Sequence, residues 1–122
     1  MNFYYEGQLI RSSKNHHYAY ACVIKVGEKW HCLGCSSSKA GAERVKKDKI
    51  REYERSIDSC DRAIKAYEEG KSGYYSRNHE WVTFKNYGMF ASKEDAEYRR
   101  ADLQRSLDSV KANWIIVEVE EA

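Results

Sequence analysis

The sequence predicts an α+β fold, in which an antiparallel sheet is combined with two helices, one of them long. Alternating apolar side chains over residues 18–26 are typical of a half-buried strand. Apolar residues spaced by three and four over residues 50–67 indicate one face of a helix. A second helix is expected to open at residues 92–95, which have the form of a capping box. The predicted order is βββ-α-ββ-α-β, and the chain length favours a single ligand-binding and oligomerisation domain over residues 1–122.

The other strands are expected at short apolar or aromatic runs that are separated by polar turns. These runs cover residues 3–11, 29–34, 81–84, 89–90 and 114–119. We interpret Gly7 as a bulge that interrupts the first run. Residues 71–80 are largely polar and are expected to form a loop.

The long helix is expected over residues 39–69, with Gly70 placed to end it. Its length would be ~46 Å, whereas a compact domain of this size is roughly 35 Å across. The apolar seam of the helix would then extend beyond its own domain and would need a partner, so we expect a homo-oligomer, a dimer or larger. The expected interface consists of Ile50, Tyr53, Ile57, Ile64 and Tyr67.

Composition limits the possible environments and partners. No stretch approaches the ~20 apolar residues that span a bilayer, and the first residues do not resemble a signal peptide. We therefore expect a cytoplasmic protein that does not contact a membrane. The formal net charge of +2 does not by itself argue for nucleic acid, which we regard as an unlikely partner.

Cys32 and Cys35 form a Cys-x-x-Cys motif, which zinc sites and redox-active thiol pairs share. Cys22 and Cys60 would complete four ligands, but the chain has no second paired motif. We favour structural thiols that pack as small apolar groups, and we expect no metal. A zinc site and a redox pair remain the alternatives.

No residue pattern indicates an enzyme. His16 and His17 could act as acids or bases near neutral pH, but they follow a polar loop and are expected to be exposed. No serine, histidine and aspartate set and no glycine-rich phosphate loop is evident. We expect a binding protein without a cofactor.

Basic and aromatic residues provide the strongest indication of a ligand. Arginine side chains suit phosphate groups, and aromatic rings such as Trp81 and Phe84 could stack on a base. The basic residues form two sets, which are Arg99, Arg100 and Arg105 on the second predicted helix and Arg44, Lys47, Arg51 and Arg55 on the first. Carboxylates lie close to these basic residues in the sequence. The basic residues could therefore equally form surface ion pairs over an aromatic core, without binding a ligand.

Residues 81–88, Trp-Val-Thr-Phe-Lys-Asn-Tyr-Gly, and residues 90–97, Phe-Ala-Ser-Lys-Glu-Asp-Ala-Glu, resemble the phage-encoded anti-Thoeris proteins of the first described type. The resemblance implies a sponge in the cytoplasm of a host bacterium. Such a sponge binds a cyclic ADP-ribose-type or cyclic nucleotide immune signal without cleaving it, and it inhibits an anti-phage defence system as an oligomer. An aromatic side chain would stack on adenine, while arginines with Asn86 and Asp102 would hold pyrophosphate and ribose. The ligand-binding residues implied are Trp81, Phe84, Asn86, Arg99, Arg100, Asp102 and Arg105.

Two alternatives accompany this hypothesis. The basic face of the first helix is compatible with a small interaction protein that inhibits a host nuclease or a nucleic-acid-binding protein. Residues 90–96 also look like half of a peptidoglycan-binding sporulation-related repeat. That family works outside the membrane, and the expected cytoplasmic location disfavours it.

Overall fold

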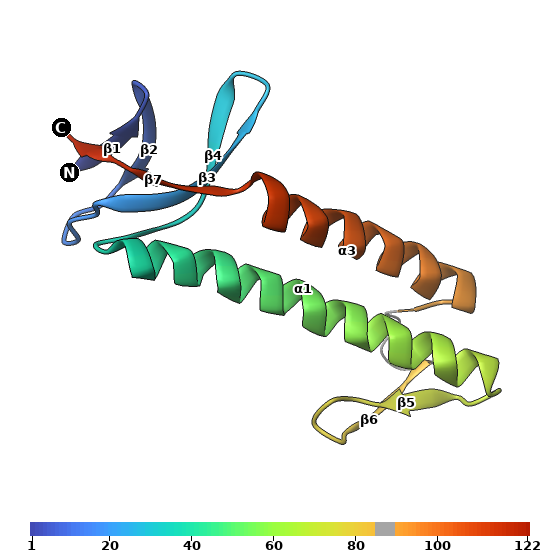
Figure 1. Cartoon of the computed structure of the whole chain (residues 1–122). Helices are drawn as coiled ribbons and strands as arrows, with labels where there is room; N and C mark the ends of the chain where they lie inside the picture. The colour runs from blue at the N-terminus through green and yellow to red at the C-terminus, as the bar shows by residue number, and fades with distance from the viewer. Residues whose placement is uncertain (85–89) are drawn as a thin grey trace. The chain divides into compact units, whose positions relative to one another are not determined.

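The computed structural model describes residues 1–84 and 90–122, and it confirms the α+β class (Figure 1). Two helices and eight strands lie in these described residues, and the strands pair antiparallel. The chain divides into two compact units. Unit 1 comprises Met1–Ile50 with Ser109–Ala122, and unit 2 comprises Arg51–Asp108. Helices α1 (Lys39–Glu68) and α3 (Lys93–Asn113) each contribute residues to both units.

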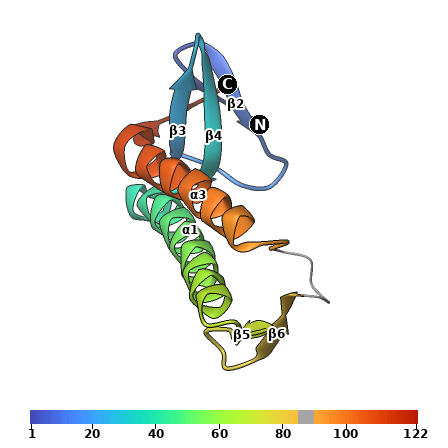
Figure 2. The same cartoon turned by 90° about the vertical axis from the view of Figure 1, so that its right-hand side faces the viewer.

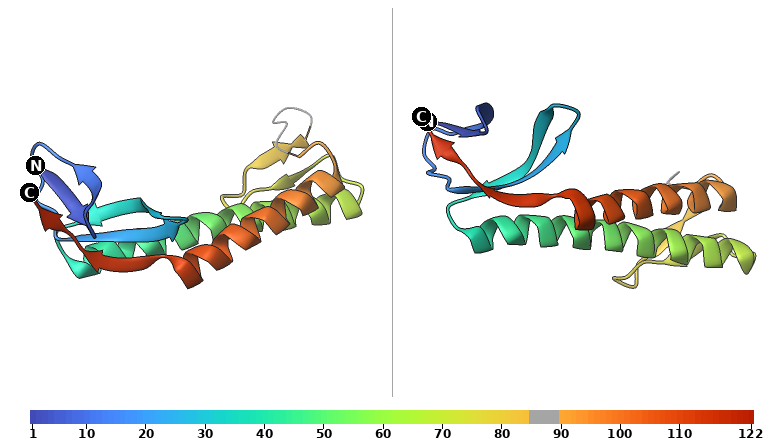
Figure 3. Two further views of the ribbon diagram at one scale, coloured as in Figure 1. Left: turned by 90° about the horizontal axis from the view of Figure 1, so that it is seen from above. Right: turned by 45° about the horizontal axis from the view of Figure 1, so that its top comes forward.

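Unit 1 begins with a hairpin of β1 (Asn2–Tyr5) and β2 (Gln8–Ser12). The predicted single strand over residues 3–11 was therefore wrong. Glu6 and Gly7 have φ values of 48° and 79°, and positive φ at both central residues is the geometry of a tight hairpin turn. Strand β8 (Glu120–Glu121) pairs with the other edge of β1, so the two chain ends lie side by side (Figure 3).

The second sheet of unit 1 consists of β3 (Tyr20–Val26), β4 (Lys29–Ser36) and β7 (Ile115–Glu118), in the strand order β4-β3-β7. The predicted hairpin of the first two segments is confirmed (Figure 2). The predicted alternation was wrong, because Ala21, Cys22 and Val23 are all buried whereas Val26 is exposed. A register shift between Cys22 and Val23 interrupts the alternation at this point.

Unit 2 packs its parts of α1 and α3 and a hairpin of β5 (Gly73–Tyr75) and β6 (Trp81–Thr83) around one core (Figures 1 and 2). The buried core residues are Cys60, Ala63, Ala66, Tyr74, Phe90 and Ala96. The loop predicted for residues 71–80 was wrong over β5. The strand predicted for residues 89–90 lies in part outside the described residues, and Phe90 itself is buried outside any strand.

Both helices begin and end where local chemistry requires. Gly70 follows α1 with a φ of 71°, and its N–H donates to the carbonyl of Tyr67 at 3.1 Å. Before α3, the Ser92 hydroxyl accepts a hydrogen bond from the Asp95 N–H at 3.1 Å, and the Asp95 carboxylate accepts one from the Ala91 N–H at 3.2 Å. The predicted helix bounds, residues 39–69 and 92 to about 112, are thus confirmed to within about one residue.

The apolar seam of α1 has partners within the chain. Ile57 is buried, and Ile64 and Tyr67 pack against the core of unit 2. Ile50 and Tyr53 are half-buried. Three of the five expected interface residues are therefore buried or packed within the chain, and the other two are half-buried. Self-association through this seam stays a prediction.

No helix among the described residues carries an apolar stretch long enough to cross a lipid bilayer.

Candidate anion-binding site

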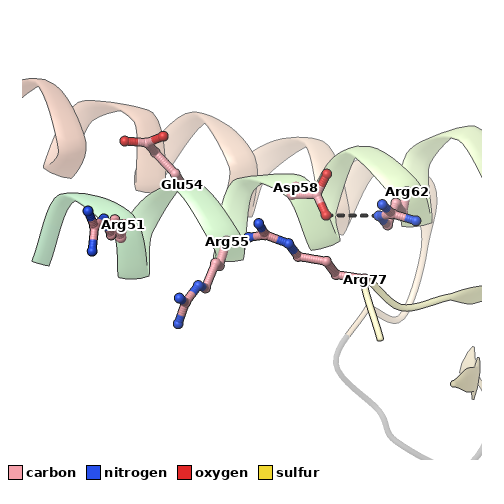
Figure 4. A pocket seen from close by; sticks show the side chains of 6 residues that line it. All are labelled: Arg51, Glu54, Arg55, Asp58, Arg62 and Arg77. Carbon is pink, nitrogen blue, oxygen red and sulfur yellow. Dashed lines mark hydrogen bonds and ion pairs between the residues drawn. The ribbon is translucent and has the colours of Figure 1, made fainter. Parts of the chain in front are cut away.

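A hollow of about 600 Å³ lies on the surface of unit 2 (Figure 4). It is lined by Arg51, Glu54, Arg55, Asp58, Arg62 and Arg77. Four of these six side chains are arginines and two are carboxylates, so the lining carries a formal charge of +2 (4 − 2). This concentration of guanidinium groups makes the hollow the strongest candidate for an anionic ligand.

Helix periodicity brings most of the lining together. Arg51, Arg55, Asp58 and Arg62 are spaced by four, three and four residues along α1, so they share one face of the helix. That face differs from the apolar seam, whose residues Ile64 and Tyr67 pack against the core of unit 2. The arginines therefore line a solvent-facing surface.

Arg77 reaches the same hollow from the turn between β5 and β6, and it extends toward α1 (Figure 4). The turn is held by hydrogen bonds across it. The Ser76 N–H donates to the Glu80 carbonyl at 2.8 Å, and the Glu80 N–H donates to the Ser76 hydroxyl at 3.2 Å. The hairpin thus fixes where the Arg77 side chain begins.

The arginines differ in how they are engaged. Arg62 pairs with Asp58 at 2.8 Å and donates to the Tyr75 carbonyl at 3.2 Å, so it is held against both α1 and β5. The guanidinium groups of Arg55 and Arg77 make no ion pair or hydrogen bond with another described residue. An incoming phosphate could therefore bind to both without displacing a protein carboxylate.

A second hollow, of about 870 Å³, shares Asp58 and Arg62 with the first. Its wall includes Tyr75 and Trp81, which are 60% and 43% exposed. Their rings pack edge to face with centroids 5.0 Å apart. Exposed aromatic rings beside Arg62 are a suitable surface for a flat base attached to phosphate.

Of the six implied ligand residues that the structure describes, Trp81 is the one that lines these two hollows. Phe84 stacks on Tyr67 with centroids 4.0 Å apart and packs against the core. Asn86 lies outside the described residues.

The remaining expected ligand residues lie on α3 and are engaged with neighbours or exposed. Arg100 forms an ion pair with Asp61 on α1. Asp102 pairs with Arg105 at 3.3 Å, and Arg99 is exposed. None of the three arginines lines either of the two hollows described above, and their part in ligand binding stays a prediction.

Sequence reasoning assigned Arg51 and Arg55 to a basic stripe of the first helix, but it missed Arg62 and Arg77. The helical spacing from Arg55 to Arg62 was a signal that could have found the former. Arg77 lies in a turn whose hairpin was itself not predicted, so no spacing pointed to it.

The predicted metal and acid–base candidates do not converge with this site. In residues 1–84 and 90–122, no group of three or more histidine, cysteine, aspartate or glutamate side chains is placed to hold a metal ion. His16 and His17 are exposed on unit 1, where the Nδ1 atom of His17 lies 3.4 Å from the Glu121 carboxylate.

No protein-family model matches the chain, and no curated protein or solved structure matches it either. The arginine-lined hollow and the ring pair beside it are the features of the chain that indicate a ligand.

Proposed function

We propose that the chain binds a nucleotide-like phosphorylated signal of the cyclic ADP-ribose type on unit 2 and sequesters it without cleaving it. The observation that carries the proposal is the arginine-lined hollow, which shares Arg62 with the hollow bordered by Tyr75 and Trp81. Arg55, Arg62 and Arg77 would hold the phosphates. The exposed rings would stack on the base.

Sequestration rather than turnover is part of the proposal because of the side chains around the two hollows. Arginine stays protonated at any ordinary pH and serves as an anion holder rather than as a general base. Asp58 is already paired with Arg62. The anti-defence role, inhibition of a bacterial anti-phage system by removing its signal, rests on the resemblance of residues 81–97 to the anti-Thoeris sponges.

The test is a retention experiment with cyclic ADP-ribose as the probe and ADP-ribose as a second probe. The protein is incubated with the probe, free probe is removed, and the protein is heat-denatured so that the released compound can be identified by chromatography. Release of intact cyclic ADP-ribose supports the proposal. A changed compound would mean an enzyme, and no retention of either probe would overturn the proposal.

Variants then assign the site. Replacing Arg55 and Arg77 together by alanine removes two charged donors, and hydrogen bonds to charged groups contribute about 1.5–3 kcal/mol each, so affinity should fall by at least about a hundredfold. Lys14→Ala is the control, because it also removes an exposed positive charge but lies on unit 1, outside both hollows and outside the ligand residues that the resemblance implied. Equal loss in the control would show that general charge, not this site, binds the probe.

A second candidate, binding of a nucleic-acid phosphate backbone by an inhibitor-like interaction protein, is favoured by one observation. A third hollow, of about 450 Å³, continues along the same face and shares Arg55, Asp58 and Arg77 with the first. An extended basic groove could follow a single strand. Binding to a labelled oligonucleotide that weakens steeply with salt would favour this candidate over the sponge.

A further inference from the structure

Two of the four cysteines meet on β4 of unit 1. The Sγ atoms of Cys32 and Cys35 lie 3.6 Å apart, and both thiols are free. Residues three apart on a regular strand point to opposite faces, so this approach needs an explanation.

The register of the β3–β4 hairpin explains why the two sulfur atoms approach each other. Cys35 is paired with Ala21 and Cys32 with Val23, and these two partners are two residues apart on β3. The register shift between Cys22 and Val23 adds one residue to β4 between the two cysteines. Both cysteines therefore lie on the face of Ala21 and Val23, where they pack against the core of unit 1.

The surroundings make the two thiols unequal. A hydrogen bond from Cys35 lowers the pKa of Cys32 to about 7, with Arg11 adding to the effect and burial opposing it. The pKa of Cys35 is raised, first because it donates to Cys32 and then because it is partly buried. At neutral pH, Cys32 is thus the thiol with thiolate character, and Cys35 holds its proton.

The other two cysteines provide a contrast within the same chain. Cys22 and Cys60 are fully buried, and burial raises the pKa of Cys22 to about 11. Cys22 is paired with Gly34 and not with either thiol of the pair. Buried, protonated thiols of this kind are inert, whereas Cys32 and Cys35 are half-buried and within reach of small molecules.

We propose that Cys32 and Cys35 form a redox-active dithiol, which a low-molecular-weight disulfide oxidises to a reversible disulfide within the chain. The proposal is based on two observations. The Cys32 and Cys35 thiols are free and adjacent on one face of β4, and the other two thiols of the chain are buried. The proposal does not depend on the ligand proposed for unit 2. It replaces the expectation of purely structural thiols.

The reaction balances with glutathione disulfide as the oxidant. The Cys32 thiolate attacks one sulfur of glutathione disulfide, so that a mixed disulfide forms and one glutathione thiolate leaves and takes up a proton. Cys35 loses its proton to solvent, attacks the Sγ atom of Cys32 and displaces the second glutathione thiolate. Two protein thiols are oxidised, and one glutathione disulfide is reduced to two glutathiones.

The alternative use of a Cys-x-x-Cys pair is metal binding, and the donor set argues against it. A structural zinc ion needs about four ligands. In the part of the chain that the structure describes, no third histidine, cysteine or carboxylate completes a group with these thiols.

The test uses the reduced full-length protein in glutathione buffers of increasing oxidised fraction. Exposed thiols are then trapped with iodoacetamide, and intact mass and peptide mapping follow. We expect the loss of two hydrogens and a link between Cys32 and Cys35, reversed by dithiothreitol, while Cys22 and Cys60 stay reduced. Oxidation spread evenly over all four cysteines, or no link under oxidising buffer, would overturn the proposal.

Variants separate the roles of the two sulfurs. Cys35→Ser removes the resolving thiol, so the reaction should stop with one glutathione attached at Cys32. The double variant Cys22→Ala with Cys60→Ala is the matched control and should form the link like the unchanged chain. If either control cysteine must be present for oxidation, the assignment to the Cys32–Cys35 pair is wrong.

A pH profile provides a second readout that does not depend on disulfide formation. Alkylation of Cys32 in the reduced chain should rise with a midpoint near pH 7, about one to two pH units below that of an ordinary thiol. A midpoint at the ordinary value, or protection of both thiols by added Zn²⁺ at equimolar concentration, would contradict a redox-active pair.

Discussion

The two units use their polar chemistry in opposite ways. Unit 1 is built from strands, and its distinctive groups, Cys32 and Cys35, lie half-buried against an apolar core. Unit 2 is built mainly from helix, and its distinctive groups are arginines on a solvent-facing hollow. The sheet unit therefore makes its two thiols unequal through the hydrogen bond between them, whereas the helical unit presents permanent charges to solvent.

The core of unit 2 is made largely of small side chains. Three of the six buried residues of the unit 2 core are alanines, and a fourth is Cys60. Small side chains let backbones approach closely, and larger rings such as Tyr67 and Phe84 fill the edges. We expect the two units to respond differently to the same kinds of substitution, and the following predictions test this from the largest effect to the smallest.

The largest effect is expected in unit 1 from Phe3→Ala. Phe3 is 0% exposed, and its ring packs edge to face on Tyr18 with centroids 5.2 Å apart. Removing a buried phenyl group leaves a cavity and should lower the free energy of unfolding by about 3–5 kcal/mol, measured by urea denaturation. Leu9→Ala is the matched control, because Leu9 lies on the same hairpin but is 48% exposed. Similar losses in both variants would mean that the burial of Phe3 is not what stabilises the hairpin.

In unit 2, the most damaging small change is expected at Gly73. A Cβ atom on this residue would overlap the carbonyl oxygen of Val82 on the paired strand β6. Because the obstacle is backbone, the hairpin must shift, and Gly73→Ala should cost about 1–3 kcal/mol. Peptide-resolved hydrogen exchange should show lost protection in β5 and β6.

The same variant tests the anion site. Arg77 is placed by the β5–β6 turn, so a shifted hairpin should also weaken binding of the cyclic ADP-ribose probe. Ser72→Ala is the control, because it changes a neighbouring exposed side chain without adding an atom against β6. If probe binding persists unchanged in Gly73→Ala while the hairpin loses protection, the hairpin does not form part of the site.

A smaller loss is expected from Tyr67→Phe. The Tyr67 hydroxyl donates to the carbonyl of Phe90 at 2.7 Å, while its ring stacks on Phe84. The variant keeps the stacking and removes the hydrogen bond, which should lower the free energy of unfolding by about 1 kcal/mol. Tyr98→Phe, at a side chain 72% exposed on α3, should change it by less than about 0.5 kcal/mol.

The outcome at Tyr67 bears on the seam of α1 as well. The sequence placed Tyr67 at an interface between copies, and the structure packs it inside unit 2. A clear loss in a monomeric sample, checked by light scattering, would support the intrachain role. If the free energy of unfolding falls only at concentrations where an oligomer forms, Tyr67 lies at the predicted interface between copies.

The parts of the fold that the sequence predicted are those in which local signals agree with tertiary packing. The three-four spacing from Ile50 to Tyr67 and the capping residues at Ser92 and Asp95 specify helices whichever surface covers them. The hairpin at Glu6 was missed because a non-glycine residue at positive φ is uncommon, so the local sequence did not favour a turn there.

The sequence predicted the kind of ligand for the anion-binding site, but it did not predict which residues form that site. Arginines beside aromatic residues indicated a phosphate and base ligand, but which arginines meet depends on the β5–β6 hairpin that brings Arg77 and Trp81 to α1. The thiol pair depends on one register shift in β4, which no local pattern reveals. In both cases the missing information was a strand pairing, which depends on contacts distant in sequence.

The smallest expected effect, and the one with the opposite sign, is at Thr83 on β6. Its buried hydroxyl oxygen has no hydrogen-bond partner among the described residues, so it loses its contact with water without compensation. Thr83→Val replaces this hydroxyl by a methyl group of similar shape and should raise the free energy of unfolding by up to about 1 kcal/mol, or leave it unchanged. Thr83→Ser is the matched control, because it keeps the hydroxyl and removes the methyl group, and it should destabilise the chain. If the valine variant is the less stable of the two, the hydroxyl makes a stabilising hydrogen bond, and unit 2 then relies on buried polar groups rather than keeping its polar chemistry at the surface.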